Sequence, residues 1–192
     1  MVDSGGDTPI MLAEYQFTLG DSAFLSRVPD KTIRNWLARG VIAVGKRHFV
    51  GRWTFNMLDI IKLTVMYGLM VRLQLPPASA VLLAEAVAQD AWDGTARDHG
   101  GKLLSDDGVK PNRNLLVAFD DNGQVVAAWA DIKKAGFCYA ASAKGSPLLS
   151  PEQVEAFRHP HVVIPTTALI HDLILRTEDL ARHNEQNEGS GD

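Results

Sequence analysis

The first regular pattern in the chain is a short stretch after Thr18 in which hydrophobic residues recur at helical spacing. Thr18 can accept a hydrogen bond from the first turn and so cap a helix. Within that helix Leu19, Ala23 and Phe24 are expected to face inward. Residues 26–30, which include a proline, cannot continue the helix and are expected to form a turn.

A second helix is predicted directly after this turn. Ile33, Trp36 and Leu37 share one face at helical spacing, and we expect that face, Trp36 included, to be buried. Gly40 follows the last helical residue, where glycine readily adopts the left-handed conformation that ends a helix. The outer face is then polar and carries Lys31, Thr32, Arg34, Asn35 and Arg39.

Alternating and β-branched residues next predict a hairpin, and helical spacing then returns. Strands are expected at 41–44 and 49–55, with residues 45–48 near the bend between them. Asn56 can cap a third helix, which ends before two prolines, and a fourth helix is expected at 78–89.

The second half has a different pattern. Residues 90–114 contain four glycines and one proline with scattered charges, as in a boundary between domains. Strands at 115–119 and 124–129 flank an Asn-Gly turn, and a last strand is expected at 161–164. The helix that follows, to about His183, has an apolar stripe that needs cover from the small sheet or from a second copy of the chain: Leu169, Ile170, Leu173, Ile174 and Leu180.

These elements predict an α+β fold with two small domains. The length of 192 residues and the hydrophobic content of 46% are sufficient for one sizeable core or two small ones. The expected organisation is a disordered N-terminus at 1–14, a helical and hairpin domain at 15–90, a linker at 91–114, a strand-plus-helix oligomerisation or interaction domain at 115–183, and a disordered tail at 184–192.

Positive charge is concentrated in the first of these domains. The whole chain has a net charge of −4, which by itself argues against a nucleic-acid partner. The segment from Lys31 to Leu73, however, contains eight basic residues and one acidic residue, Asp59, so its net charge is +7. Such a segment can release counterions from duplex DNA when it docks.

Residues 18–89 resemble the MerR-type winged helix-turn-helix family. The resemblance rests on Thr32-Ile33-Arg34 with the aromatic Trp36, on Arg39-Gly40-Val41 at the helix end, and on Gly51-Arg52 with Phe55, followed by Asn56 and Asp59-Ile60. The chain departs from the family pattern where Asn35-Trp36 replaces an aromatic pair, and where Arg52 precedes Phe55 by three residues. The second half lacks the long coiled coil of the metal-sensing and drug-sensing members, and in that respect the chain is closer to phage-like or mobile-element regulators.

The resemblance implies a winged helix-turn-helix domain that binds double-stranded DNA as a dimer, followed by a small β-hairpin-plus-helix domain. In that family the second helix enters the major groove and the wing contacts the backbone. Arginine and asparagine can each make two hydrogen bonds to a base edge, whereas wing residues position the protein without reading sequence. The expected DNA-binding residues are Lys31, Thr32, Arg34, Asn35, Arg39, Lys46, Arg47, His48 and Arg52, and the apolar stripe of the last helix is expected to form the homodimer or a higher oligomer.

Other chemistry finds little support. His159 and His161, with His171 and His183 on the last helix, lack the spacing of a metal site, and no serine or cysteine lies in a recognisable nucleophile context, so we expect no metal, no cofactor and no enzyme. A single cysteine, Cys138, fits a reducing compartment. With no export signal and no apolar stretch that could span a membrane, a cytoplasmic, nucleoid-associated bacterial protein is expected.

Three functions remain open from sequence. The first is a sequence-specific transcription regulator. The second is an excisionase-like recombination factor that bends DNA. The third is a protein-interaction or ligand-sensing adaptor whose basic segment binds DNA only weakly.

Overall fold

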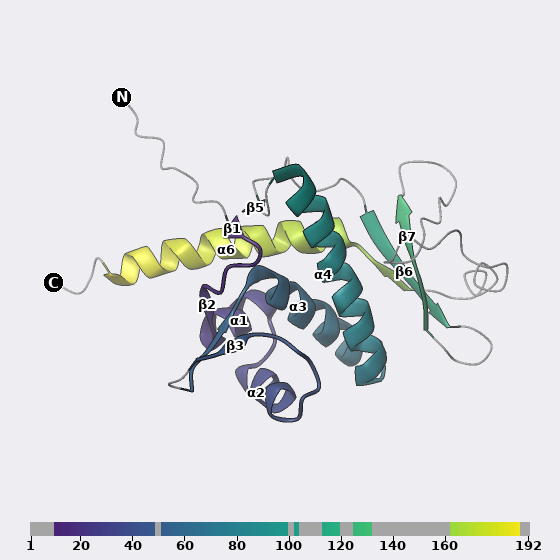
Figure 1. Ribbon diagram of the computed structural model, residues 1–192, viewed down its shortest axis with the longest axis horizontal. Helices are drawn as coiled ribbons and strands as arrows, with labels where there is room; N and C mark the ends of the chain where they lie inside the picture. Colours follow the sequence, from purple (N-terminus) through teal and green to yellow (C-terminus); the bar gives the residue numbers. More distant parts are fainter. Residues whose placement is uncertain are drawn as a thin grey trace.

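The computed structural model describes residues 10–48, 51–99, 102–103, 113–119, 125–131 and 162–188, and it has an α+β fold (Figure 1). The helices of the described residues are α1 (Leu19–Ser26), α2 (Asp30–Ala38), α3 (Met57–Arg72), α4 (Pro77–His99) and α6 (Thr166–Glu188). The strands are β1 (Ile10–Met11), β2 (Phe17–Thr18), β3 (Lys46–Arg47), β4 (Trp53–Phe55), β5 (Lys102–Leu103), β6 (Arg113–Phe119), β7 (Val125–Asp131) and β8 (Val162–Ile164).

The strands form three small antiparallel sheets. Near the N-terminus β4 lies between β2 and β3, with Phe17 opposite Phe55 and Lys46 opposite Thr54. β1 pairs with β5. Later in the chain β6 lies between β7 and β8, and the pairing of Phe119 with Val125 confirms the predicted hairpin.

Two helices begin at the predicted capping residues. Thr18 accepts a hydrogen bond from the backbone N–H of Asp21, and the Asp21 carboxylate accepts one from the backbone N–H of Thr18. Asn56 and Asp59 form the same reciprocal arrangement at the start of α3. Each capping box satisfies backbone donors that the helix itself leaves unpaired.

One hydrophobic core joins the two halves of the chain. Ile60, Leu63 and Leu69 of α3 belong to the same buried cluster as Leu83 and Ala84 of α4. Leu115 and Val117 of β6, with Ile170, Leu173 and Ile174 of α6, also belong to it. In Figure 1 α6 runs past the N-terminal helices to the side where β6 and β7 lie. The two halves are therefore packed together along α1, β6 and α6.

The structure corrects several predicted boundaries. Residues 10–14 are not a disordered end, because β1 pairs with β5 and Leu12 is completely buried. Residues 91–99 are not linker, because α4 continues through them. Residues 184–188 belong to α6, since the sequence has no helix-breaking residue before Gly189.

Two predictions inside the first domain were also wrong. Phe24 is 55% exposed, because the inner face of α1 is formed by Ser22, Leu25 and Ser26. Residues 41–44 form no strand, because this segment has no strand partner in the sheet. Ile42 and Val44 are nevertheless buried. The first strand of the hairpin is instead Lys46–Arg47.

Candidate nucleic-acid interface

The rotation of α2 is fixed by its buried side chains. Ile33 is fully buried, and Trp36 is nearly so and packs with its ring centroid 6.4 Å from that of Tyr67 on α3. This confirms the expected inner face. Because the inner face is fixed, the opposite face points to solvent: Lys31, Arg34, Asn35 and Arg39 are exposed, and Thr32 is half-buried.

Arg34 is paired with an acidic residue of its own helix. Its Nε lies 2.6 Å from Asp30 Oδ1 and its Nη2 lies 3.2 Å from Asp30 Oδ2. The hydrogen bond to Asp30, together with the charge of that carboxylate, raises the pKa of Arg34. Asp30 approaches the guanidinium from the Nε side, so the outer edge, Nη1 and the second hydrogen of Nη2, still points away from the pair.

Asp30 is a residue of this surface that the sequence analysis did not select. The aspartate and the arginine are four residues apart on one helix, a spacing that brings opposite charges together. That spacing is visible in the sequence and was sufficient to find the pair. Asp30 also lies in the first turn of α2, where a negative charge is favoured by the helix dipole.

The hairpin of β3 and β4 exposes a second group of basic side chains. Lys46, Arg47, His48 and Arg52 are all exposed. His48 Nε2 is joined to Thr54 Oγ1 across the hairpin by a hydrogen bond of 2.8 Å, and the backbone N–H of His48 donates to the carbonyl of Arg52. Trp53 is half-buried, and its ring stacks on that of Phe55.

The connection between α2 and the hairpin is short and closely packed. Gly40 and Gly45 bracket it, both with positive φ. A Cβ on Gly45 would lie 2.9 Å from the Phe55 ring, so only glycine fits this approach. Ile42 and Val44, between the two glycines, enter the same core as Ile33 and Phe55. The segment therefore fixes the hairpin relative to α2.

Asp59 links this connection to the start of α3. Besides the cap of Asn56, its buried carboxylate accepts a hydrogen bond from the backbone N–H of Gly45. Burial raises the pKa of Asp59, and the hydrogen bonds from Asn56 and Gly45 oppose that rise only in part. A buried carboxylate thus ties the hairpin to α3.

We call the exposed residues of α2 and the hairpin the basic face, and define it as Lys31, Arg34, Asn35, Arg39, Lys46, Arg47, His48 and Arg52. All of them come from the predicted DNA-binding set, in which Thr32 alone is half-buried. In Figure 1 α2 and β3 both lie in the lower part of the molecule, away from β6 and β7.

The predicted dimerisation residues lie elsewhere and are largely covered by the chain itself. Ile170, Leu173 and Ile174 are buried in the common core, and Leu169 and Leu180 pack against it. The sequence left two surfaces open as cover for this stripe, the small sheet or a second copy of the chain. The small sheet contacts α6 through β6, and α1 contacts α6 as well. A dimer would therefore need additional residues.

The described residues contain no group of three or more histidine, cysteine, aspartate or glutamate side chains that could hold a metal ion. Cys138, His159 and His161 lie outside the described residues. Within the ranges that the structure describes, no helix is both long and apolar enough to cross a membrane. Comparison of the chain with protein-family models gives no match, and comparison with curated proteins gives none either.

Proposed function

We propose that this chain is a sequence-specific DNA-binding regulator of the MerR-like winged helix-turn-helix type, with α2 in the major groove and the β3–β4 hairpin on the backbone. The observation that carries the proposal is the basic face. Its cations come from two elements whose inner sides share one core through Ile33, Ile42, Val44 and Phe55. Their outer sides are therefore held in a constant relation, as a duplex with fixed groove spacing requires.

Arg34 is the residue we assign to base readout. Asp30 occupies its Nε and one hydrogen of Nη2. The outer edge of the guanidinium can still donate two hydrogen bonds to O6 and N7 of a guanine in the major groove. The pair also restricts the arginine rotamer before binding, so less side-chain entropy is lost when the base is contacted.

The hairpin is assigned to phosphate contact. Lys46, Arg47 and Arg52 extend into solvent from a short two-stranded ribbon. Cations on such a ribbon can neutralise phosphates of either strand without reading sequence. The hydrogen bond of His48 to Thr54 leaves this residue a smaller role, that of bracing the hairpin.

Two-fold symmetry is part of the proposal, because a single recognition helix contacts only a few base pairs. The apolar stripe of α6 is mostly packed within one chain. We therefore place the dimer contact on exposed residues of the C-terminal half. A two-fold symmetric DNA site would indicate that the chain binds as such a dimer.

The test is selection of bound duplexes from a random pool with the wild-type chain, followed by affinity measurement on the selected site and on a scrambled duplex. We expect an enriched palindromic site that contains guanine. Arg34→Ala should weaken binding to that site by about tenfold to a hundredfold and bind the scrambled duplex nearly as wild type does. Asp30→Ala should reduce the same preference less, because the arginine remains but is no longer oriented.

Arg182→Gln is the matched control, since Arg182 is an exposed arginine of α6 paired with Asp179. It should leave both affinities unchanged. A pool that yields no enriched sequence, or an equal loss on both duplexes for Arg34→Ala, would contradict base readout by α2.

A further inference from the structure

The ends of α1 and α3 and the start of α6 enclose a pocket of about 570 Å³. This volume lies within the range of small-molecule sites. Its apolar wall includes Leu69, Val71, Val163, Ile164 and Leu169. Val71 and Val163 are 57% and 44% exposed, so the pocket contains apolar surface that the chain itself does not cover.

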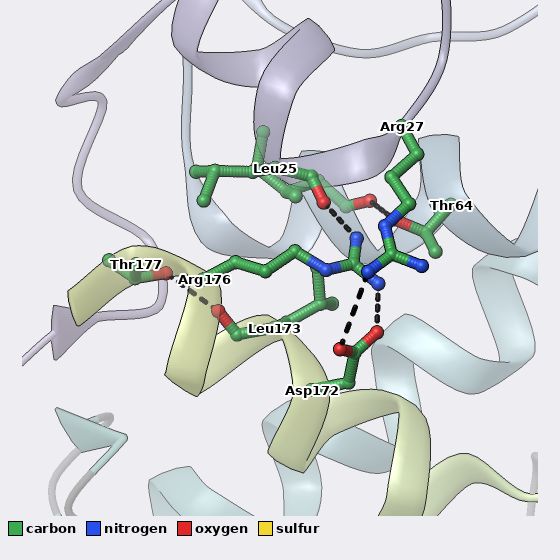
Figure 2. Close-up of polar contacts among 8 residues, drawn as sticks. Leu25, Arg27, Thr64, Asp172, Leu173, Arg176 and Thr177 are labelled. Atoms are coloured by element: carbon green, nitrogen blue, oxygen red, sulfur yellow. Dashed lines mark hydrogen bonds and ion pairs between the residues drawn. The ribbon is translucent and has the colours of Figure 1, made fainter. Parts of the chain in front are cut away.

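Three arginines are among the residues that line this pocket. Arg27 lies just past the end of α1, Arg72 at the end of α3 and Arg176 on α6, and Asp172 is the one acidic residue among the described lining residues. Figure 2 shows Arg27 and Arg176 together over Asp172, each joined to it by a dashed line. The described lining thus carries three arginines and one carboxylate, which leaves an excess of positive charge.

Two features of Arg176 accompany this excess of positive charge. Burial lowers the pKa of Arg176, and the positive charge of Arg27 lowers it further. Among the described side chains, Arg176 Nε is buried and has no hydrogen-bond partner. A buried donor without a partner is uncommon in folded proteins, so the polar groups beside this pocket are not fully satisfied by the described residues.

We propose that this pocket binds a small amphipathic anion, a molecule with one carboxylate or sulfonate group and an apolar body. The anionic group would lie between Arg27 and Arg72, both of which are exposed, and would add the negative charge that Asp172 alone does not supply. The apolar body would cover Val71 and Val163. Apolar lining with a few convergent polar groups is the usual composition of such sites.

The test uses a pair of fluorescent probes on the full chain without DNA. 8-Anilinonaphthalene-1-sulfonate has the required anionic group, and N-phenyl-1-naphthylamine has the same rings without it. We expect saturable binding of the sulfonate probe at one site, at least about tenfold tighter than the neutral probe, as one charge-assisted hydrogen bond would give.

Three variants separate the parts of the site. Arg27→Gln and Arg72→Gln change exposed residues and should each weaken binding of the sulfonate probe severalfold, with binding of the neutral probe unchanged. Ala168→Trp should abolish binding of both probes, because Ala168 is an exposed lining residue whose replacement fills the pocket without entering the core. Arg182→Gln removes an equal charge away from the pocket and should change neither. Thermal unfolding followed by circular dichroism checks that each variant is folded.

Equal affinity for the two probes in the wild-type chain, or unchanged binding by Ala168→Trp, would overturn the proposal. So would sedimentation that shows a dimer of the wild-type chain and a monomer of Ala168→Trp, since the occupant would then be a second copy. The results of the probe experiments do not depend on the result of the DNA selection, because the probes are titrated without a duplex.

Discussion

Arg34 on α2 is 66% exposed and pairs with Asp30 inside its own helix, whereas Arg176 on α6 is 12% exposed and contacts residues of α1. We call Leu25, Arg27, Asp172 and Arg176 the α1–α6 junction. On the basic face the arginine has hydrogen atoms left for a partner outside the chain. At the junction the arginine donates to the carbonyl of Leu25, a residue 151 positions earlier.

The difference shows that one residue type can remain open to an outside partner at one place and can join two parts of the fold at another. The last turn of α1 leaves carbonyl groups without partners in the helix. The backbone N–H of Arg27 donates to one of them, that of Phe24, and Arg176 donates to that of Leu25. Arg176 thus acts as a cap supplied from the other half of the chain, which joins α6 to the N-terminal helices (Figure 2).

The largest effect should come from removing charge on the basic face. The double variant Lys46→Gln/Arg47→Gln removes two of the proposed phosphate contacts, so the slope of log affinity against log salt should fall by about 1.8. Affinity for duplex DNA at about 0.1 M salt should fall several tens of fold, on selected and scrambled sequences alike. Fluorescence anisotropy at several salt concentrations measures both quantities. A slope equal to that of wild type would remove the hairpin from the interface.

A substitution at the α1–α6 junction should change the free energy of unfolding and not the salt dependence of DNA binding. Arg176→Ala leaves the Leu25 carbonyl without its donor, and we expect a loss of about 2 to 3 kcal/mol in the free energy of unfolding. Arg182→Ala removes an exposed ion pair and should change it by less than about 0.5 kcal/mol. Urea unfolding compares the two. Equal effects would mean that the junction contributes no more than a surface pair.

Sequence patterns identified the basic face more completely than the junction for a physical reason. The cap of Thr18, the inner face of α2, the cap of Asn56 and the 115–129 hairpin all depend on residues close together in the chain. Local spacing is sufficient to predict them.

The features that sequence missed depend on distant partners. β1 and β2 are two residues long and exist because of β5 and β4, so neither has a pattern of its own. Arg176 directly follows the apolar run Leu173-Ile174-Leu175 of α6, and nothing near it in the sequence indicates the carbonyl that it reaches. Serine at positions 22 and 26 misled the choice of the inner face of α1, because their hydroxyls donate to backbone carbonyls one turn earlier and so can be buried.

A smaller effect is expected from pH, at the carboxylate that ties the hairpin to α3. Since burial raises the pKa of Asp59, the folded chain retains a proton at this residue over a pH range in which the unfolded chain has lost it. The contribution of Asp59 to stability is thus greatest below the unfolded pKa and is lost as pH rises through the folded pKa.

Asp59→Asn removes this titration. The free energy of unfolding of wild type, relative to that of Asp59→Asn, should increase as pH falls from 7 toward the ordinary aspartate value of 3.8. A difference that is constant across this range, measured by urea unfolding, would show that the carboxylate titrates normally.

The smallest expected effect connects the two regions, and it depends on both proposals. Tyr67 lines the pocket proposed to bind an anion, and its ring lies against Trp36, which fixes the inner face of α2. An occupant that moves Tyr67 would therefore change the position of α2.

Decanoate should first be shown to displace the sulfonate probe from the free chain. It should then change the affinity of the chain for the selected duplex severalfold, which is a typical size for coupling between two sites. Tyr67→Phe keeps the ring contact and should retain the effect, whereas Tyr67→Ala should remove it while DNA binding persists. If decanoate displaces the probe but leaves the duplex affinity unchanged, the pocket and the basic face are independent, and the contact between Tyr67 and Trp36 serves only the core.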